Sequence, residues 1–135
     1  MWAGFLEKKA VGIGRPVPDF KLAGLDGKTV SLSESRGKIV MIHFWSATCP
    51  FVLRYDDRLK AITKDYADRG VVVLGIDSNG NETPEKIKAV AKERNVNYSI
   101  LLDPGNKVAD QFGAITTPHV FILNKEGVLV YEGAR

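Results

Sequence analysis

The single cysteine of the chain is the residue best suited to covalent chemistry. Cys49 is the only thiol among 135 residues, so any disulfide that it forms must join it to another molecule. A reactive thiol acts as a thiolate, which can attack a disulfide or a peroxide. The sequence therefore predicts monothiol chemistry if Cys49 is reactive, and an inert, buried side chain if it is not.

The elements on either side of Cys49 favour the reactive alternative. The apolar run over residues 38–45 predicts a strand that is buried on both faces. After Pro50 the apolar residues recur at intervals of three and four, which predicts an amphipathic helix ending at Gly70. Cys49 should then lie at the N-terminus of a helix, where unpaired backbone N–H groups stabilise a thiolate.

A second apolar run, residues 71–76, follows this helix and predicts another buried strand. Strand, helix and strand in this order form a βαβ unit with parallel strands and a right-handed crossover. In an open α/β sheet the reactive crevice lies beyond the carboxyl ends of such strands. We expect Cys49 at that crevice, and the polar residues 77–80 at its border.

The remaining segments complete an α/β fold with a mixed sheet. Residues 20–22 and 29–32 predict an N-terminal hairpin, because Gly and Asp separate them. Thr83 is a candidate N-cap for a second helix, and a short third helix should follow Asp103. A final hairpin, with strands from residues 119 and 128, closes the sheet in the antiparallel sense. The expected order is strand, strand, strand, helix, strand, helix, helix, strand, strand.

Composition limits the partners and the compartment. With 44% hydrophobic and 26% charged residues, the chain reads as one globular domain over residues 16–135, preceded by a flexible segment, 1–15. The net charge is +3, and the basic residues alternate with acidic ones along the chain, which argues against nucleic acid as a partner. The apolar runs are too short to span a membrane, which takes about 20 residues. The first residues lack the order of a signal peptide. The sequence therefore leaves the compartment open: cytoplasmic as the chain stands, and periplasmic or otherwise extracytoplasmic if a signal or anchor has been removed.

Several of these residues together resemble a known family. Phe44-Trp45 followed by Cys49-Pro50, and much later by Thr117-Pro118, is similar to the thioredoxin fold with its Cys-x-x-Cys helix and its cis-proline. The lead-in resembles that of redoxins, meaning the TlpA/ResA-like and AhpC/TSA proteins. The resemblance implies a three-layer thioredoxin-like fold with an N-terminal hairpin extension, and an oxidoreductase or antioxidant activity. The lead-in motifs are Pro18-Asp19-Phe20, Leu25-Asp26-Gly27-Lys28 and Arg36-Gly37-Lys38.

The chain departs from this family where the chemistry is expected. Val52 stands where the second cysteine of Cys-x-x-Cys belongs, so the internal dithiol cycle is absent. Thr48 replaces an aromatic residue, and His43 stands where thioredoxins have a buried acid. Ser46 and Pro50 partly match the Thr/Ser-x-x-Cys-Pro of peroxiredoxins. Because only part of the peroxiredoxin motif is present, the sequence does not decide whether a peroxide or a disulfide oxidises Cys49.

The candidate site therefore consists of one catalytic residue and its supports. His43 is either a hydrogen-bonded core residue or a proton relay. Cys49, His43 and His119 lack the spacing of metal ligands, so we expect no metal and no other cofactor. The catalytic residue is Cys49, and the supporting residues are His43, Trp45, Ser46, Thr48, Pro50, Val52, Thr117 and Pro118.

Two functions are compatible with this site. The first is a thiol-disulfide oxidoreductase or peroxiredoxin-like enzyme, in which Cys49 attacks a disulfide or peroxide and an external thiol restores it. The second is a binding module that keeps the redoxin scaffold and holds a thiol-bearing or extended peptide beside Thr117-Pro118. The partner is a protein or small-molecule thiol or disulfide in both cases. The sequence does not identify that partner or the oligomeric state.

Overall fold

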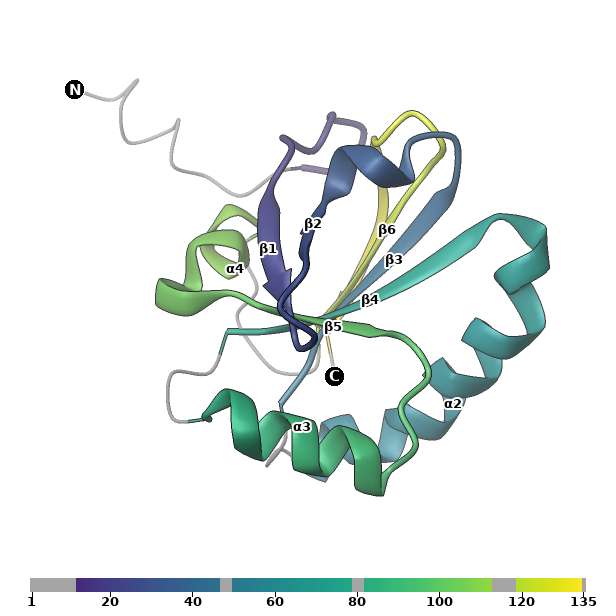
Figure 1. The fold of residues 1–135 in the computed structure, drawn as a ribbon. Helices are drawn as coiled ribbons and strands as arrows, with labels where there is room; N and C mark the ends of the chain where they lie inside the picture. Colours follow the sequence, from purple (N-terminus) through teal and green to yellow (C-terminus); the bar gives the residue numbers. More distant parts are fainter. Residues whose placement is uncertain (1–11, 47–49, 79–81, 113–118, 135) are drawn as a thin grey trace.

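The structure is a computed structural model that describes residues 12–46, 50–78, 82–112 and 119–134. Within these residues a mixed sheet of seven strands has the order β2-β1-β5-β4-β3-β6-β7 (Figure 1). The predicted α/β class with a central mixed sheet is confirmed. The strands are β1 (Lys21–Gly24), β2 (Thr29–Ser31), β3 (Ile39–Phe44), β4 (Val71–Asp77), β5 (Ser99–Leu102), β6 (His119–Leu123) and β7 (Leu129–Ala134).

Three α-helices and three short 3₁₀ helices connect these strands in the described part of the chain. No helix there is both long and apolar enough to cross a membrane. The α-helices are α2 (Pro50–Tyr66), α3 (Pro84–Glu93) and α4 (Lys107–Phe112), and the 3₁₀ helices are η1 (Leu32–Ser35), η2 (Ala67–Arg69) and η3 (Pro104–Asn106).

The segment from β3 through α2 to β4 is the βαβ unit that the sequence predicts. The two strands are parallel, with Ile39 beside Val71 and Phe44 beside Ile76. The turn after α2 and η2 is made at Gly70, whose φ of 76° lies in the left-handed region that favours glycine. Because β3 and β4 are parallel, their carboxyl ends meet at the edge of the sheet where α2 begins.

The structure adds one strand, β5, to the predicted order. β5 is parallel to β4 and antiparallel to β1, so the N-terminal hairpin β1–β2 extends the same sheet through it. The expected succession of two helices after β4 was therefore wrong, because this strand separates α3 from α4. Its apolar run, Ile100 to Leu102, is too short to show a strand's alternation. The extended state comes from hydrogen bonds to strands on both sides rather than from a local preference.

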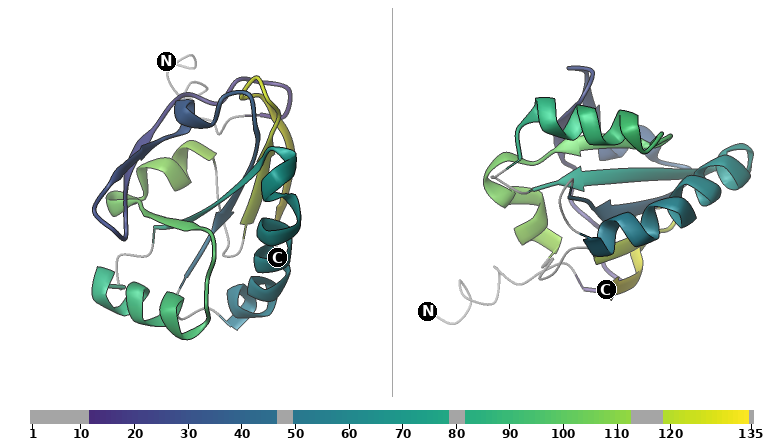
Figure 2. Two further views of the ribbon diagram at one scale, coloured as in Figure 1. Left: turned by 45° about the vertical axis from the view of Figure 1, so that its right-hand side comes forward. Right: turned by 90° about the horizontal axis from the view of Figure 1, so that it is seen from below.

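The sheet divides the core into two clusters of buried residues. Val108 and Ala109 of α4 belong to one cluster, whereas Leu59 of α2 and Ile87 of α3 belong to the other. α4 therefore covers one face and α2 and α3 cover the opposite face, which confirms the three layers (Figures 1 and 2). The α4-side cluster consists of Val17, Phe20, Leu32, Val40, Ile42, Phe44, Leu74, Ile76, Leu101, Val108, Ala109, Phe121, Leu123 and Leu129. The α2/α3-side cluster consists of Trp45, Leu59, Val73, Ile87, Tyr98 and Ile100.

Two local features complete the scaffold. Thr83 is the N-cap of α3, as predicted, and its Oγ1 accepts a hydrogen bond from the backbone N–H of Lys86 at 3.2 Å. Near the start of the described chain, the backbone N–H of Gly14 donates to the carbonyl oxygen of Leu129 at 2.8 Å. The carbonyl oxygen of Arg15 in turn accepts from the N–H of Leu129 at 3.0 Å. The division between residues 1–15 and 16–135 stays a prediction.

Candidate active site

The carboxyl end of β3 brings together three predicted site residues, His43, Trp45 and Ser46. All three are buried, with 0%, 1% and 4% of their surface exposed. The backbone N–H of Trp45 donates to the carbonyl oxygen of Ile76 at 2.7 Å, which continues the pairing of β3 with β4 beyond the end of the strand. The sheet therefore fixes these residues just before the chain reaches Cys49.

His43 faces the α2/α3 side of the sheet. Side chains alternate along a strand, and Trp45, two residues further on, belongs to the α2/α3-side cluster. The neighbours of His43 across the sheet are Gly75 on β4 and Val120 on β6. The burial of the imidazole is compatible with a core role and with a proton relay, and both stay predictions.

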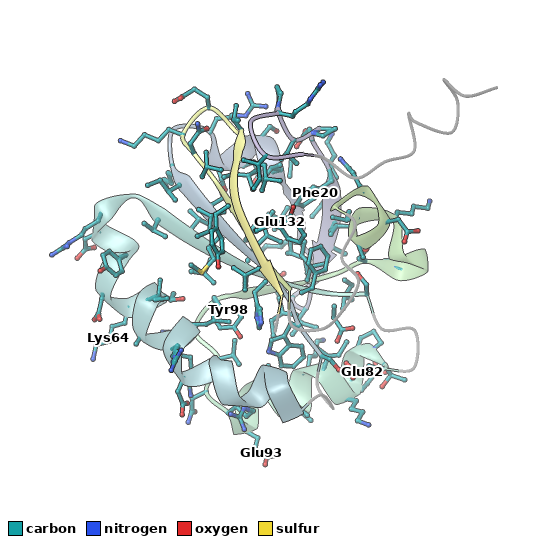
Figure 3. All side chains as sticks on the ribbon, turned by 180° about the vertical axis from the view of Figure 1, so that it is seen from behind. Phe20, Lys64, Glu82, Glu93, Tyr98 and Glu132 are labelled. Atoms are coloured by element: carbon teal, nitrogen blue, oxygen red, sulfur yellow. The ribbon has the colours of Figure 1, made fainter. Side chains whose placement is uncertain are left out.

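Gly75 and Tyr98 shape the surroundings of His43, although the sequence analysis did not single them out. A Cβ atom at position 75 would lie 3.0 Å from Cε1 of Tyr98, which is shorter than the optimal separation of carbon atoms, about 3.5–4.0 Å. Tyr98 is 7% exposed and lies between the sheet and the helices (Figure 3). Glycine at position 75 therefore makes room for an aromatic ring on this face of the sheet.

Ser46 is the last described residue before Cys49, and its side chain forms a buried hydrogen bond. The Oγ of Ser46 donates to Oε2 of Glu82 at 2.6 Å. Glu82 is 8% exposed and lies beside the start of α3 (Figure 3). The bond joins the end of β3 to the connection before α3, across 36 residues of sequence.

A second polar group lies where β4 and β5 end. The carboxyl group of Asp103 is 1% exposed and accepts hydrogen bonds from the backbone N–H groups of Val108 and Ala109, both at 3.0 Å. It also accepts from Oγ of Ser78 at 2.7 Å. The backbone N–H of Asp103 donates to the carbonyl oxygen of Asp77 at 3.0 Å. This carboxyl group thus satisfies N–H groups at the start of α4, which a helix otherwise leaves without partners.

A pocket of about 360 Å³ opens beside both polar groups. The acidic residues Asp77, Glu82 and Asp103 line it, together with apolar residues that include Ile87 and Leu102. It lies at the carboxyl ends of β4 and β5, which is the edge where the sequence places the crevice. Asp77 and Ser78 therefore border a pocket at that edge, and the expectation that residues 77–80 border the crevice of Cys49 stays a prediction.

The other predicted site residues are placed only in part. Thr48, Cys49, Thr117 and Pro118 lie outside the described residues. Pro50 begins α2 and Val52 is in its first turn, although only their backbone is described. The structure therefore confirms the strand before Cys49 and the helix after it, and the roles of the individual site residues stay predictions.

Metal binding receives no support from the described part of the chain. Within residues 12–46, 50–78, 82–112 and 119–134, no group of three or more His, Asp or Glu side chains is arranged to hold a metal ion. His43 is buried in the sheet, and the side chains of Cys49 and His119 are not described.

The sheet order, the three layers and a helix that begins directly after Cys49 define a protein of thioredoxin-like fold. The chain belongs to the AhpC/TSA family, whose model matches residues 13–132. The resemblance to redoxins is therefore confirmed over nearly the whole chain.

Known relatives agree with this family. The chain is 25% identical over 128 residues to the thiol-disulfide oxidoreductase ResA of Bacillus thuringiensis, covering 95% of this chain and 73% of that protein. It is 31% identical over 124 residues to the thioredoxin-like protein YneN of Bacillus subtilis, covering 90% and 72%. The crystal structure of an exposed lipoprotein thioredoxin of Streptococcus pneumoniae is similar with a TM-score of 0.78 and 32% identity, covering 87% and 90%.

Proposed function

We propose that this chain is a monothiol oxidoreductase in which Cys49 exchanges disulfides with protein or small-molecule thiols. The observation that carries the proposal is the junction around Cys49. The strand before it ends in buried residues, and the helix after it begins at Pro50. N–H groups in a first helical turn stabilise a thiolate. The name of the relative ResA, a thiol-disulfide oxidoreductase, supports the same chemistry.

One catalytic cycle of the proposed reaction has two thiol–disulfide exchange steps. The Cys49 thiolate attacks one sulfur of the substrate disulfide, so a new S–S bond forms, the old one breaks, and the other sulfur leaves as a thiolate. An external thiolate then attacks the substrate sulfur of this mixed disulfide. Its electron pair displaces Cys49, which leaves as a thiolate. Cys49 is regenerated and the substrate sulfur ends in a disulfide with the external thiol.

The external thiol is required because the chain has no second cysteine. Val52 stands three residues after Cys49, in the first turn of α2. We therefore predict that Val52→Cys converts the site into a dithiol that can close on itself, after a small adjustment at the helix end. The variant should reduce insulin disulfides with dithiothreitol well above wild type. An internal disulfide without turnover would count against an enzyme.

Intact-mass spectrometry tests the wild-type protein. After treatment with glutathione disulfide, we expect one glutathione adduct on Cys49, which dithiothreitol removes. Graded peroxide provides a second arm, since a sulfenate at low doses would favour the peroxide chemistry to which Ser46 and Pro50 point. A protein that forms neither adduct while folded would reject the oxidoreductase proposal.

The alternative is a binding module built on the same scaffold. The absence of a second cysteine favours it, because a module that only holds a partner needs no resolving thiol. In that case the protein should retain an extended cysteine-containing peptide without exchanging disulfides. Comparing peptide binding by wild type and by Cys49→Ser separates the two, because a binding groove keeps part of its affinity without the thiol.

A further inference from the structure

The hydrogen bond between Ser46 and Glu82 is buried, although glutamate is a residue that usually lies at the protein surface. Glutamate is almost never buried unless it is paired, yet Glu82 is 8% exposed and Ser46 is 4% exposed. Their oxygen atoms are 2.6 Å apart. This length falls within the range of about 2.5–3.0 Å for hydrogen bonds between two oxygen atoms.

This bond holds a residue that lies close to Cys49 in the sequence. Ser46 precedes Cys49 by three residues, and Pro50 begins α2 directly after it. Three residues of chain reach at most about 11 Å, so whatever fixes Ser46 limits where the thiol can lie. The N–H of Trp45 fixes the backbone just before Ser46 by donating to Ile76. The side chain of Ser46 then ties the end of β3 to the start of α3.

We propose that Glu82 is a positioning residue for Cys49. Through Ser46, it holds the connection between β3 and α2 in the geometry that attack on a disulfide requires. Thiol exchange needs the attacking sulfur in line with the bond that breaks, and small displacements of a reacting group are costly. This inference rests on the proposed function of Cys49, but it concerns a residue that the sequence analysis did not identify.

Two properties of Glu82 can be separated by substitution. Its oxygen accepts the hydrogen bond, and its carboxyl group, which can carry a charge, belongs to a residue that lines the same pocket as Asp77 and Asp103. Glu82→Gln keeps an accepting oxygen and removes the charge, whereas Glu82→Ala removes both. Ser46→Ala removes only the donating hydroxyl. If position is what Glu82 provides, Glu82→Gln should resemble wild type, and the two alanine variants should resemble each other.

The chain offers a matched control in a second serine–glutamate pair. Ser31 and Glu34 form a hydrogen bond of 3.3 Å between their side chains, at the start of η1. η1 follows β2, which lies in the hairpin at one edge of the sheet, whereas Cys49 lies between β3 and α2. Ser31→Ala and Glu34→Ala therefore report what the loss of such a pair does to the protein in general.

The test measures the second-order rate constant of Cys49 with a small aromatic disulfide and with iodoacetamide, from pH 6 to pH 10. The plateau at high pH, where the thiol is fully ionised, is compared between variants. We expect Ser46→Ala and Glu82→Ala to lower the disulfide plateau roughly tenfold, and the double variant to fall no further. Glu82→Gln should stay within about twofold of wild type, as should Ser31→Ala and Glu34→Ala.

Other outcomes overturn the inference. Unchanged plateaus in both alanine variants, with melting temperatures lowered as in the Ser31 and Glu34 controls, would make the bond merely structural. A loss in Glu82→Gln equal to that in Glu82→Ala would assign the effect to charge instead of position. If Glu82→Ala does not fold, Ser46→Ala, which deletes one oxygen atom, decides alone. A wild-type protein that alkylates but does not exchange disulfides rejects the proposed function, and the alkylation plateaus then decide the role of Glu82.

Discussion

The two faces of β3 differ in the chemistry that they bury. Val40, Ile42 and Phe44 alternate toward the α4-side cluster, so the residues of β3 on that face are apolar. The intervening residues face α2 and α3, and among them His43 and the neighbouring Trp45 carry ring nitrogens. The residues of β3 thus contribute to a hydrophobic core on one face of the sheet and place polar ring nitrogens on the other.

The difference indicates a division of work between the faces. The α4 side contributes stability, because apolar burial there carries no cost for unsatisfied polar atoms. At the carboxyl ends of the strands lie the connection to Cys49, the Ser46–Glu82 hydrogen bond and the pocket lined by Asp77, Glu82 and Asp103. Substitutions on the α4 side should therefore change unfolding alone, and those on the other side should change unfolding, the thiol chemistry or both.

The largest effect is expected from Cys49→Ser. A serine hydroxyl forms no disulfide, so adducts with glutathione disulfide and turnover should disappear completely. Intact-mass spectrometry measures the adducts, and circular dichroism confirms that the variant is folded. A folded variant that still forms a disulfide-type adduct would contradict the assignment, since the chain has no other thiol.

Phe121→Ala tests the α4 side. Phe121 is 0% exposed and its ring meets that of Phe44 edge to face, with centroids 5.7 Å apart. We expect the free energy of unfolding to fall by about 3–5 kcal/mol, as measured in urea. The rate constant of Cys49 in the remaining folded protein should not change. Val130→Ala on β7 is the control, because that side chain is 48% exposed and should cost less than about 0.5 kcal/mol. An altered rate constant in Phe121→Ala would show that the two faces are coupled.

Gly75→Ala tests the packing beside His43. Chain entropy favours alanine in a strand by about 0.5–1 kcal/mol, but the new Cβ would lie 3.0 Å from the Tyr98 ring. Overpacking of this kind costs about 1–3 kcal/mol, so we expect a net loss of about 1 kcal/mol in chemical unfolding. Adding Tyr98→Leu should recover part of that loss. A more stable Gly75→Ala would mean that the ring moves away freely.

The smallest effect is expected from Asp19→Asn, which lies on neither face of β3. The backbone N–H of Ser33 donates to the Asp19 carboxylate at 2.8 Å and holds the pKa of that group below its usual value. A lowered pKa stabilises the folded state above the unfolded pKa, about 3.9, and this contribution is lost as the pH falls through the folded pKa. Melting temperatures of wild type and variant should therefore differ slightly at pH 7 and converge at low pH. A constant difference would exclude the carboxylate charge as the cause.

The sequence predicts the elements around Cys49 because they carry strong local signals. β3 and β4 are uninterrupted apolar runs, α2 has a sustained helical spacing, and Thr83 followed by proline marks the start of α3. Each of these signals is complete within a single element, the longest of which is α2 with 17 residues. Hydrogen bonding within the βαβ unit then follows from the parallel arrangement that such a connection imposes.

The remainder depends on partners far away in the sequence. β5 is a strand because β4 and β1 pair with it on both sides. Glu82 is buried and accepts a hydrogen bond from Ser46, 36 residues earlier, whereas a glutamate before a helix cap is usually solvated. In the sequence, Gly75 only interrupts an apolar run. Its role follows from contact with Tyr98, which lies 23 residues later in the chain. Contacts of this kind leave no periodicity to detect.

The place of β5 has a consequence for the order in which the protein is made. β1 pairs with β2 a few residues later, but its other edge pairs with β5, where Gly24 meets Leu101 and Ala23 meets Leu102. At typical translation rates that partner strand follows β1 by roughly 4–16 seconds. During this interval the hairpin keeps a row of backbone groups open to other chains. The exposed Lys21 at the start of β1 and Lys28 beside the turn place positive charge near that open edge, which discourages pairing with a second nascent copy until β5 arrives.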